Sequence, residues 1–257
     1  MELKVSPMRV ILSLSLFGLL FYVVACTSVE HRDKSNDAKY HYLMGVSALN
    51  ENNPADALRE FMLAEQFDQR DPEIQAGLAE AYLRKEAYQK AEQHYIEALK
   101  LSDYEPKYYN NLGVLYLNMQ RFDDAIANFR LAADNLLFDR PEVSWTGIGF
   151  AEFQKQNYPA AERAYKEAVD LNNRYYQAHF RLGELYYVQG RPVEAIDRFS
   201  RSVELVPNFA EGYYWLGLTY MKIEELSKAK LAFQDVVRLS PQSERARIAQ
   251  KYLAILN

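Results

Sequence analysis

The stretch NNLGVLYLNMQRFDDAIANFRLAA, residues 110–133, contains the pattern that decides the fold. In it Gly113 precedes Ala125 by 12 residues, and an aromatic residue, Phe129, follows that alanine by four. The same order of a small residue, an alanine and an aromatic occurs six times. The steps between successive alanines are 34, 34, 36, 34 and 34 residues, and the alanines are Ala57, Ala91, Ala125, Ala161, Ala195 and Ala229. A fixed period of this size predicts a solenoid, in which each unit buries its apolar face by stacking on its neighbours.

Each period predicts two antiparallel helices joined by a short turn. In the third, Pro106 is expected to open the first helix, because the first residue of a helix needs no N–H partner. Residues 119–121 are expected to form the turn and 122–133 the second helix. Gly113 and Ala125 are expected at the helix crossing, where small side chains let two backbones approach closely. We expect six such units over residues 38–243, starting near 38, 72, 106, 142, 176 and 210, and a capping helix over 244–257.

This pattern is similar to the tetratricopeptide repeat, whose first helix carries a Leu-Gly pair and then a Tyr. The Leu and Tyr places are filled by Leu78 and Tyr82, Leu112 and Tyr116, Leu182 and Tyr186, and Leu216 and Tyr220. Departures are Ala48 and Glu152 where Tyr is expected, and Ala79 for Gly. The resemblance implies an all-α fold, a right-handed superhelical solenoid of six repeats with a C-terminal capping helix, which binds proteins and is not an enzyme.

The beginning of the chain suggests an export signal. Lys4 and Arg9 precede an apolar stretch over residues 10–24, which is too short for a membrane span of about 20 residues but suits a signal peptide. The stretch ends in Val23-Val24-Ala25-Cys26, which resembles the lipobox of bacterial lipoproteins, although Val24 departs from its usual small residue. An uncleaved anchor helix with an incidental cysteine is the alternative interpretation.

The lipobox resemblance implies a signal peptide over residues 1–25 and a covalent lipid on Cys26, with no other cofactor. Thr27 follows the cysteine, not the Asp that signals inner-membrane retention in lipoproteins of enteric type, so an outer-membrane location facing the periplasm is expected. Residues 26–37 are polar and lack periodicity, which predicts a flexible tether.

Charge and composition exclude several classes of function. The chain carries a net charge of −5 and no basic run, so it lacks the electrostatic footprint of a nucleic-acid-binding protein. Its four histidines are scattered without the spacing of a metal site, and no phosphate-binding glycine loop or catalytic constellation is visible. We therefore expect no metal, no small-molecule substrate and no catalytic residue. His179 is interpreted as a packed structural residue.

In arrays that resemble this one, the first helices of the repeats line a concave groove that binds a protein segment. The chaperone-binding members use a Lys/Asn/Arg clamp there, but Tyr42, Val46 and Gly77 occupy clamp positions in this chain. The lining is apolar, which predicts a hydrophobic or amphipathic guest, although contact between neighbouring first helices accounts for part of it. The candidate groove residues are Tyr42, Val46, Leu49, Leu83, Asn110, Asn111, Val114, Leu117, Phe150 and Phe153.

The 36-residue step falls in a linker over residues 134–142, whose Leu136, Leu137 and Phe138 form a second candidate surface. Six repeats, the lipobox, the Asn-Asn-Leu-Gly start at Asn110 and this proline-containing linker together resemble the type IV pilus pilotins. These are outer-membrane lipoproteins that assist secretin assembly, so the resemblance implies a secretin subunit as partner. The alternative within the same class is a scaffold for another envelope machine, such as peptidoglycan enzymes or polysaccharide export.

Overall fold

The computed structural model describes residues 36–256, and within that range it contains helices and no strand. By internal packing the chain divides into two compact units, Met1–Asp103 and Tyr104–Asn257, which are treated separately. At the boundary Asp103 and Tyr104 both have left-handed backbone conformations, with φ of 54° and 65°. The signal peptide, Cys26 and the tether up to residue 35 lie outside the described residues. Residues 36 and 37, expected in the tether, are already helical.

The first unit contains four described helices, which form two hairpins. They are residues 36–50, α2 (Pro54–Phe67), α3 (Pro72–Arg84) and α4 (Tyr88–Leu101). Proline opens both α2 and α3, and the preceding Asn53 and Asp71 accept hydrogen bonds from backbone N–H groups of the first turn. Such N-caps satisfy donors that have no partner inside the helix. The aromatic residue of the first repeat, Phe61, is fully buried.

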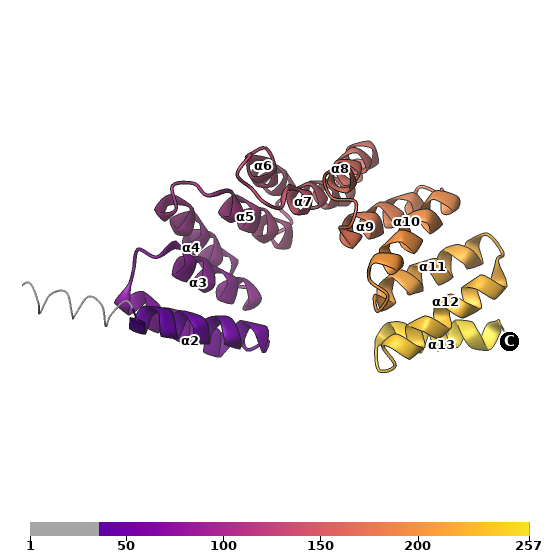
Figure 1. Cartoon of the computed structure of the whole chain (residues 1–257), viewed down its shortest axis with the longest axis horizontal. Coiled ribbons are helices and arrows are strands. Elements are labelled where there is room, and N and C mark those ends of the chain that lie inside the picture. Colours follow the sequence, from indigo (N-terminus) through magenta and orange to yellow (C-terminus); the bar gives the residue numbers. More distant parts are fainter. Residues whose placement is uncertain (1–35, 257) are drawn as a thin grey trace, which may run out of the picture. The chain divides into compact units, whose positions relative to one another are not determined.

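The second unit contains the remaining four repeats and the last helix (Figure 1). Its helices are α5 (Pro106–Asn118), α6 (Phe122–Ala133), α7 (Pro141–Gln154), α8 (Tyr158–Leu171), α9 (Tyr176–Val188), α10 (Pro192–Leu205), α11 (Ala210–Lys222), α12 (Leu226–Leu239) and α13 (Glu244–Ile255). Each first helix contacts its own second helix and the first helix of the next repeat. The all-α repeat fold and its C-terminal helix are therefore confirmed.

The small and aromatic positions of the repeat meet at the helix crossings. All six alanines of the pattern have an exposed fraction of 0%. The ring of Phe129 lies between two glycines, because a Cβ atom added to Gly113 on α5 or to Gly147 on α7 would approach that ring to 2.6 Å. No side chain larger than hydrogen fits at either position without moving the ring.

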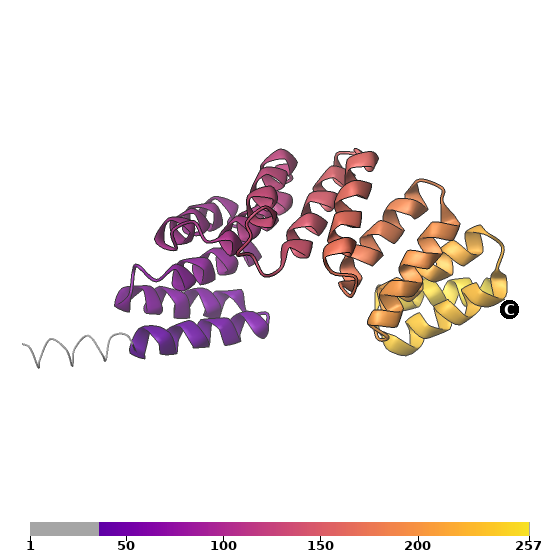
Figure 2. The same cartoon turned by 45° about the horizontal axis from the view of Figure 1, so that its top comes forward.

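Each hairpin turn depends on one left-handed residue. In the third repeat this residue is Gln120, with φ of 56°, and the following N–H of Arg121 donates to the carbonyl of Tyr116 at 2.9 Å. In the fifth repeat Gly190 occupies the equivalent place, with φ of 72°. These turns reverse the chain within a few residues, so the two helices of each hairpin are antiparallel (Figure 2).

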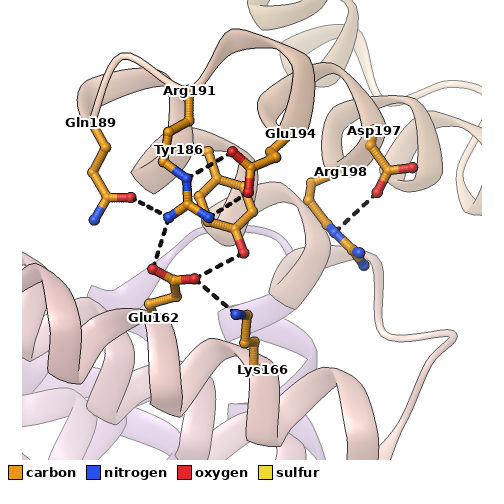
Figure 3. Close-up of polar contacts among 8 residues, drawn as sticks. All are labelled: Glu162, Lys166, Tyr186, Gln189, Arg191, Glu194, Asp197 and Arg198. Atoms are coloured by element: carbon orange, nitrogen blue, oxygen red, sulfur yellow. Dashed lines mark hydrogen bonds and ion pairs between the residues drawn. The ribbon is translucent and has the colours of Figure 1, made fainter.

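An ion cluster joins the fourth and fifth repeats (Figure 3). Glu162 on α8 accepts hydrogen bonds from Arg191 at 2.9 Å and from Tyr186 at 3.2 Å, and pairs with Lys166 at 2.8 Å. Partial burial works against its charged form, but the bonds from Lys166 and Arg191 outweigh burial and lower the pKa of Glu162. Arg191 also pairs with Glu194. Because Arg191 precedes α10 and Glu162 lies on α8, the cluster fixes one repeat against the next.

The last helix closes the array as a cap. Ser243 is the N-cap of α13, and its side chain accepts a hydrogen bond from the N–H of Ala246 in the first turn. Its small residues Ala246 and Ala249 are fully buried, and Tyr252 stacks on Phe233 with ring centroids 4.8 Å apart and planes 10° apart. The aromatic residue of the sixth repeat is therefore covered by the cap.

Candidate protein-binding surface

In the first unit, the predicted groove residues on the first helices differ in how accessible they are. Tyr42, Val46 and Leu83 are half-buried, and the first two pack against the core around Phe61. Leu49 is buried, with 8% of its surface exposed, and belongs to that core. Leu49 is therefore unavailable to a guest, because a side chain that fills the interface between helices cannot also contact a partner.

In the second unit, the first helix of the third repeat presents both apolar and amide groups. Val114 is 38% exposed and Leu117 is half-buried. The side-chain oxygen of Asn110 accepts a hydrogen bond from Ser144 at 2.8 Å, which links α5 to α7 and occupies one of the two lone pairs of that oxygen. Asn111 is half-buried. Of the predicted groove residues, Leu83 thus belongs to the first unit, and Val114 and Leu117 belong to the second.

The linker between the third and fourth repeats exposes two leucines. Leu136 and Leu137 are 100% and 86% exposed, while Phe138 is half-buried. The segment is a turn in which the side chain of Asn135 accepts from the N–H of Leu137 at 2.9 Å. Local bonds of this kind offer the backbone an alternative to helical hydrogen bonds, and this one follows the end of α6 at Ala133.

Residues of α7, α8 and α9 line a cavity of about 130 Å³. Its lining includes two predicted groove residues, Phe150 and Phe153, together with residues that the sequence did not single out: Gln154, Tyr165, Arg181 and Glu184. Arg181 donates to Glu184 at 2.8 Å, and its guanidinium lies 4.9 Å from the ring centroid of Phe150. Burial raises the pKa of Glu184, and the charge of Arg181 opposes that rise.

The sequence gives only weak signals for these additional cavity residues. Tyr165 stands at a position where four of the six repeats have Phe, and Glu184 is an acidic residue at a place where Glu80 is the equivalent in the second repeat. Each signal is slight alone, since a buried Tyr is ordinary in a helical core. Their significance comes from the fold, which brings α7, α8 and α9 together at one cavity.

His179, interpreted from the sequence as a packed structural residue, is buried, and its Nδ1 has no hydrogen-bond partner within residues 36–256. It is 3% exposed, and its Nε2 lies 3.0 Å from the carbonyl oxygen of Asn173. Burial lowers its pKa, which favours the neutral ring. No group of three or more metal-ligating side chains gathers anywhere in residues 36–256. Over the same range, no helix combines the length and the hydrophobicity that a membrane crossing requires.

Two family models match the chain, both described as the tetratricopeptide repeat. One matches residues 42–106 and 148–208, and the other matches residues 106–134 and 210–243. The chain is a tetratricopeptide-repeat protein. Together the two matches include every repeat of the array, in agreement with the helical hairpins of both units.

Among curated relatives, the BBSome complex member BBS4 of Bos taurus is 26% identical over 186 residues, which cover 71% of this chain and 35% of that protein. Anaphase-promoting complex subunit 3 of Schizosaccharomyces pombe is 26% identical over 115 residues, which cover 45% of this chain and 17% of that protein. The tetratricopeptide-repeat chain therefore spans about a third or less of these relatives.

Two solved structures match almost their whole length. PilW, described as a widely conserved type IV pilus biogenesis factor, matches with a TM-score of 0.72 and 16% identity over 83% of this chain and 98% of that chain. PilF of Pseudomonas aeruginosa matches with a TM-score of 0.69 and 17% identity over 85% of this chain and 99% of that chain. At these identities the likeness establishes a shared fold.

Proposed function

We propose that this protein is a non-enzymatic adaptor of the bacterial outer membrane, and specifically a pilotin for the type IV pilus secretin. The observation that carries the proposal is the extent of the structural match in both directions. PilW and PilF are covered at 98% and 99%, and the same matches include 83% and 85% of this chain with TM-scores of 0.72 and 0.69. The tetratricopeptide-repeat fold supports the wider adaptor class, because such arrays present surfaces for protein binding.

The lipid anchor is part of the same proposal. An acylated Cys26 holds the repeats at the membrane, and the several acyl chains of a mature lipoprotein matter because one chain alone binds membranes only marginally. We expect Cys26→Ser to release the protein from the outer membrane. Intact mass analysis of the native protein tests this directly, since an unmodified cysteine or a retained segment 1–25 contradicts the anchor.

The adaptor surface is proposed to lie on the first helices, with Leu117 as its test position. In Leu117→Glu a carboxylate facing an apolar guest loses water without gaining a partner, so partner binding is expected to be lost. The matched control is Leu131→Glu on α6, where the leucine is 53% exposed and lies on a second helix. This variant introduces the same charge away from the proposed surface.

The assay measures secretin multimers in cells that express each variant, alongside protein abundance and helicity. Multimers are expected to fall with Leu117→Glu and to remain with Leu131→Glu. Normal multimers in cells that lack the whole protein would reject the pilotin function. Normal multimers with an abundant Leu117→Glu protein would instead reject the first helices as the surface and favour the Leu136-Leu137-Phe138 linker.

A further inference from the structure

The cavity lined by α7, α8 and α9 contains a hydroxyl group that lacks a hydrogen-bond partner in the protein. Tyr165 is 1% exposed and lines the cavity, and no hydrogen bond joins its hydroxyl to any residue in the described range 36–256. Burial raises the pKa of Tyr165 well above its ordinary value, so the group is a neutral phenol. The hydroxyl is not among the fully buried unpaired polar atoms of residues 36–256, and Tyr165 lines the cavity, so its hydroxyl is accessible to a molecule that enters there.

The second repeat shows how the same hydroxyl is satisfied elsewhere in the array. There Tyr95 donates to Glu80 at 3.1 Å. The equivalent of Glu80 in the fourth repeat is Phe150, which also lies 15 residues before its tyrosine and offers no acceptor oxygen. Four repeats have phenylalanine at the tyrosine position: Phe61, Phe129, Phe199 and Phe233. The fold therefore packs a ring here without needing a hydroxyl, and the phenol of Tyr165 is free to serve a ligand.

The charges and the size of the cavity define the ligand that fits. Arg181 and Glu184 form an ion pair at 2.8 Å. An anionic ligand would be repelled by the carboxylate and a cationic ligand by the guanidinium, so a neutral group is favoured. Phe150 and Phe153 supply aromatic walls. A volume of about 130 Å³ is close to that of an engineered protein cavity of about 150 Å³ that binds benzene, so one aromatic ring fits.

We propose that this cavity receives a tyrosine side chain of a protein partner. The ring of the guest packs against Phe150 and Phe153, and its hydroxyl bonds to the hydroxyl of Tyr165. A phenol can donate and accept, so the two hydroxyls satisfy each other. The inference rests on the proposed adaptor function in one respect, namely that the ligand belongs to a protein, and it names the side chain that the adaptor recognises.

The test compares two blocked pentapeptides, Gly-Gly-Tyr-Gly-Gly and Gly-Gly-Phe-Gly-Gly, for binding to the full chain in lipid nanodiscs. Saturation-transfer NMR titrations give the two affinities. We expect the tyrosine peptide to bind about fivefold more tightly, which is the effect of one hydrogen bond of ordinary strength. In Tyr165→Phe the preference is expected to disappear. The matched control Tyr95→Phe removes the hydroxyl that Glu80 already satisfies and keeps the preference.

Three results would overturn the proposal: no binding of either peptide, equal binding of both, or an unchanged preference in Tyr165→Phe. Should Tyr165→Phe alter thermal unfolding, Gln154→Trp replaces it, because Gln154 is exposed beside the cavity and its replacement fills the space from outside. That variant is expected to weaken the tyrosine peptide at least fivefold, and unchanged binding contradicts the site. These measurements involve no secretin, so their failure is distinct from a failure of the pilotin function.

Discussion

The ring of Phe129 is packed between Gly113 and Gly147, and this packing makes Gly113→Ala a strong test of how the repeats pack. An added Cβ would lie 2.6 Å from the ring, and the ring cannot retreat because Gly147 faces it from α7 at the same distance. Overpacking of this kind costs about 1–3 kcal/mol, and the trapped ring favours the upper end. Alanine returns about 1 kcal/mol through its higher helix propensity. The net expectation is a loss of about 2 kcal/mol.

Urea unfolding followed by far-UV circular dichroism measures this loss. A loss of this size corresponds to a fall in Tm of about 4–8 °C for a chain of about 150–250 residues. The control is Gly113→Ala in a Phe129→Leu background, where the shorter side chain leaves room and the glycine substitution is expected to cost little. The packing of Phe129 between the two glycines would be refuted if the losses of unfolding free energy from the two changes were additive, or if the Gly113→Ala protein were as stable as the parent.

Three further perturbations test other parts of the array. Glu162→Gln is expected to cost about 1–2 kcal/mol of unfolding free energy, because it removes the charge that faces Arg191 and Lys166 at a side chain only 19% exposed; the more exposed Glu194→Gln should cost less in the same urea titration. Gly190→Ala should cost about 1 kcal/mol of unfolding free energy through the left-handed backbone alone, since nothing lies within 4 Å of the added Cβ. The stability of a Gly190→Asn protein should lie between that of the parent and that of Gly190→Ala. Burial lowers the pKa of His179 below that of the unfolded chain, so the unfolded state takes up the proton first and stability falls as the pH drops below about 6.5; His179→Phe should lose less stability than the parent between pH 7 and pH 5, and parallel curves would contradict this.

Much of the fold could be predicted from the sequence because the repeat fixes which residues meet. The Gly113, Ala125 and Phe129 spacing predicts a crossing between two helices, and the structure places these residues in that relation. The same reasoning is weaker for surface residues. Leu49 occupies a groove position by its place in the repeat, yet it is buried, because burial depends on the neighbouring helix and not on the period.

The cavity shows the limit of prediction from a single repeat. Tyr165 is recognisable as an unusual residue in the sequence. That its hydroxyl lacks a hydrogen-bond partner is not recognisable, because this depends on Phe150, from another helix, which occupies the position of Glu80 in the second repeat. A repeat array offers its own controls in such a case. Comparing equivalent positions within one chain separates what the fold requires, a ring, from what it does not, a hydroxyl.

The division of the chain also runs against the sequence pattern. The irregular 36-residue step lies in the linker after α6, yet α6 and α7 pack closely. The boundary between units instead lies at Asp103 and Tyr104, within a regular 34-residue step. Two consecutive left-handed residues end α4 there, which the period does not reveal because it counts residues and not dihedral angles. The apolar inner residues therefore belong to two surfaces, with Tyr42 and Val46 on the first and Val114, Leu117 and the tyrosine-accepting cavity on the second. The proposed partner contact at Leu117 and the cavity beside Phe150 both lie in the second compact unit.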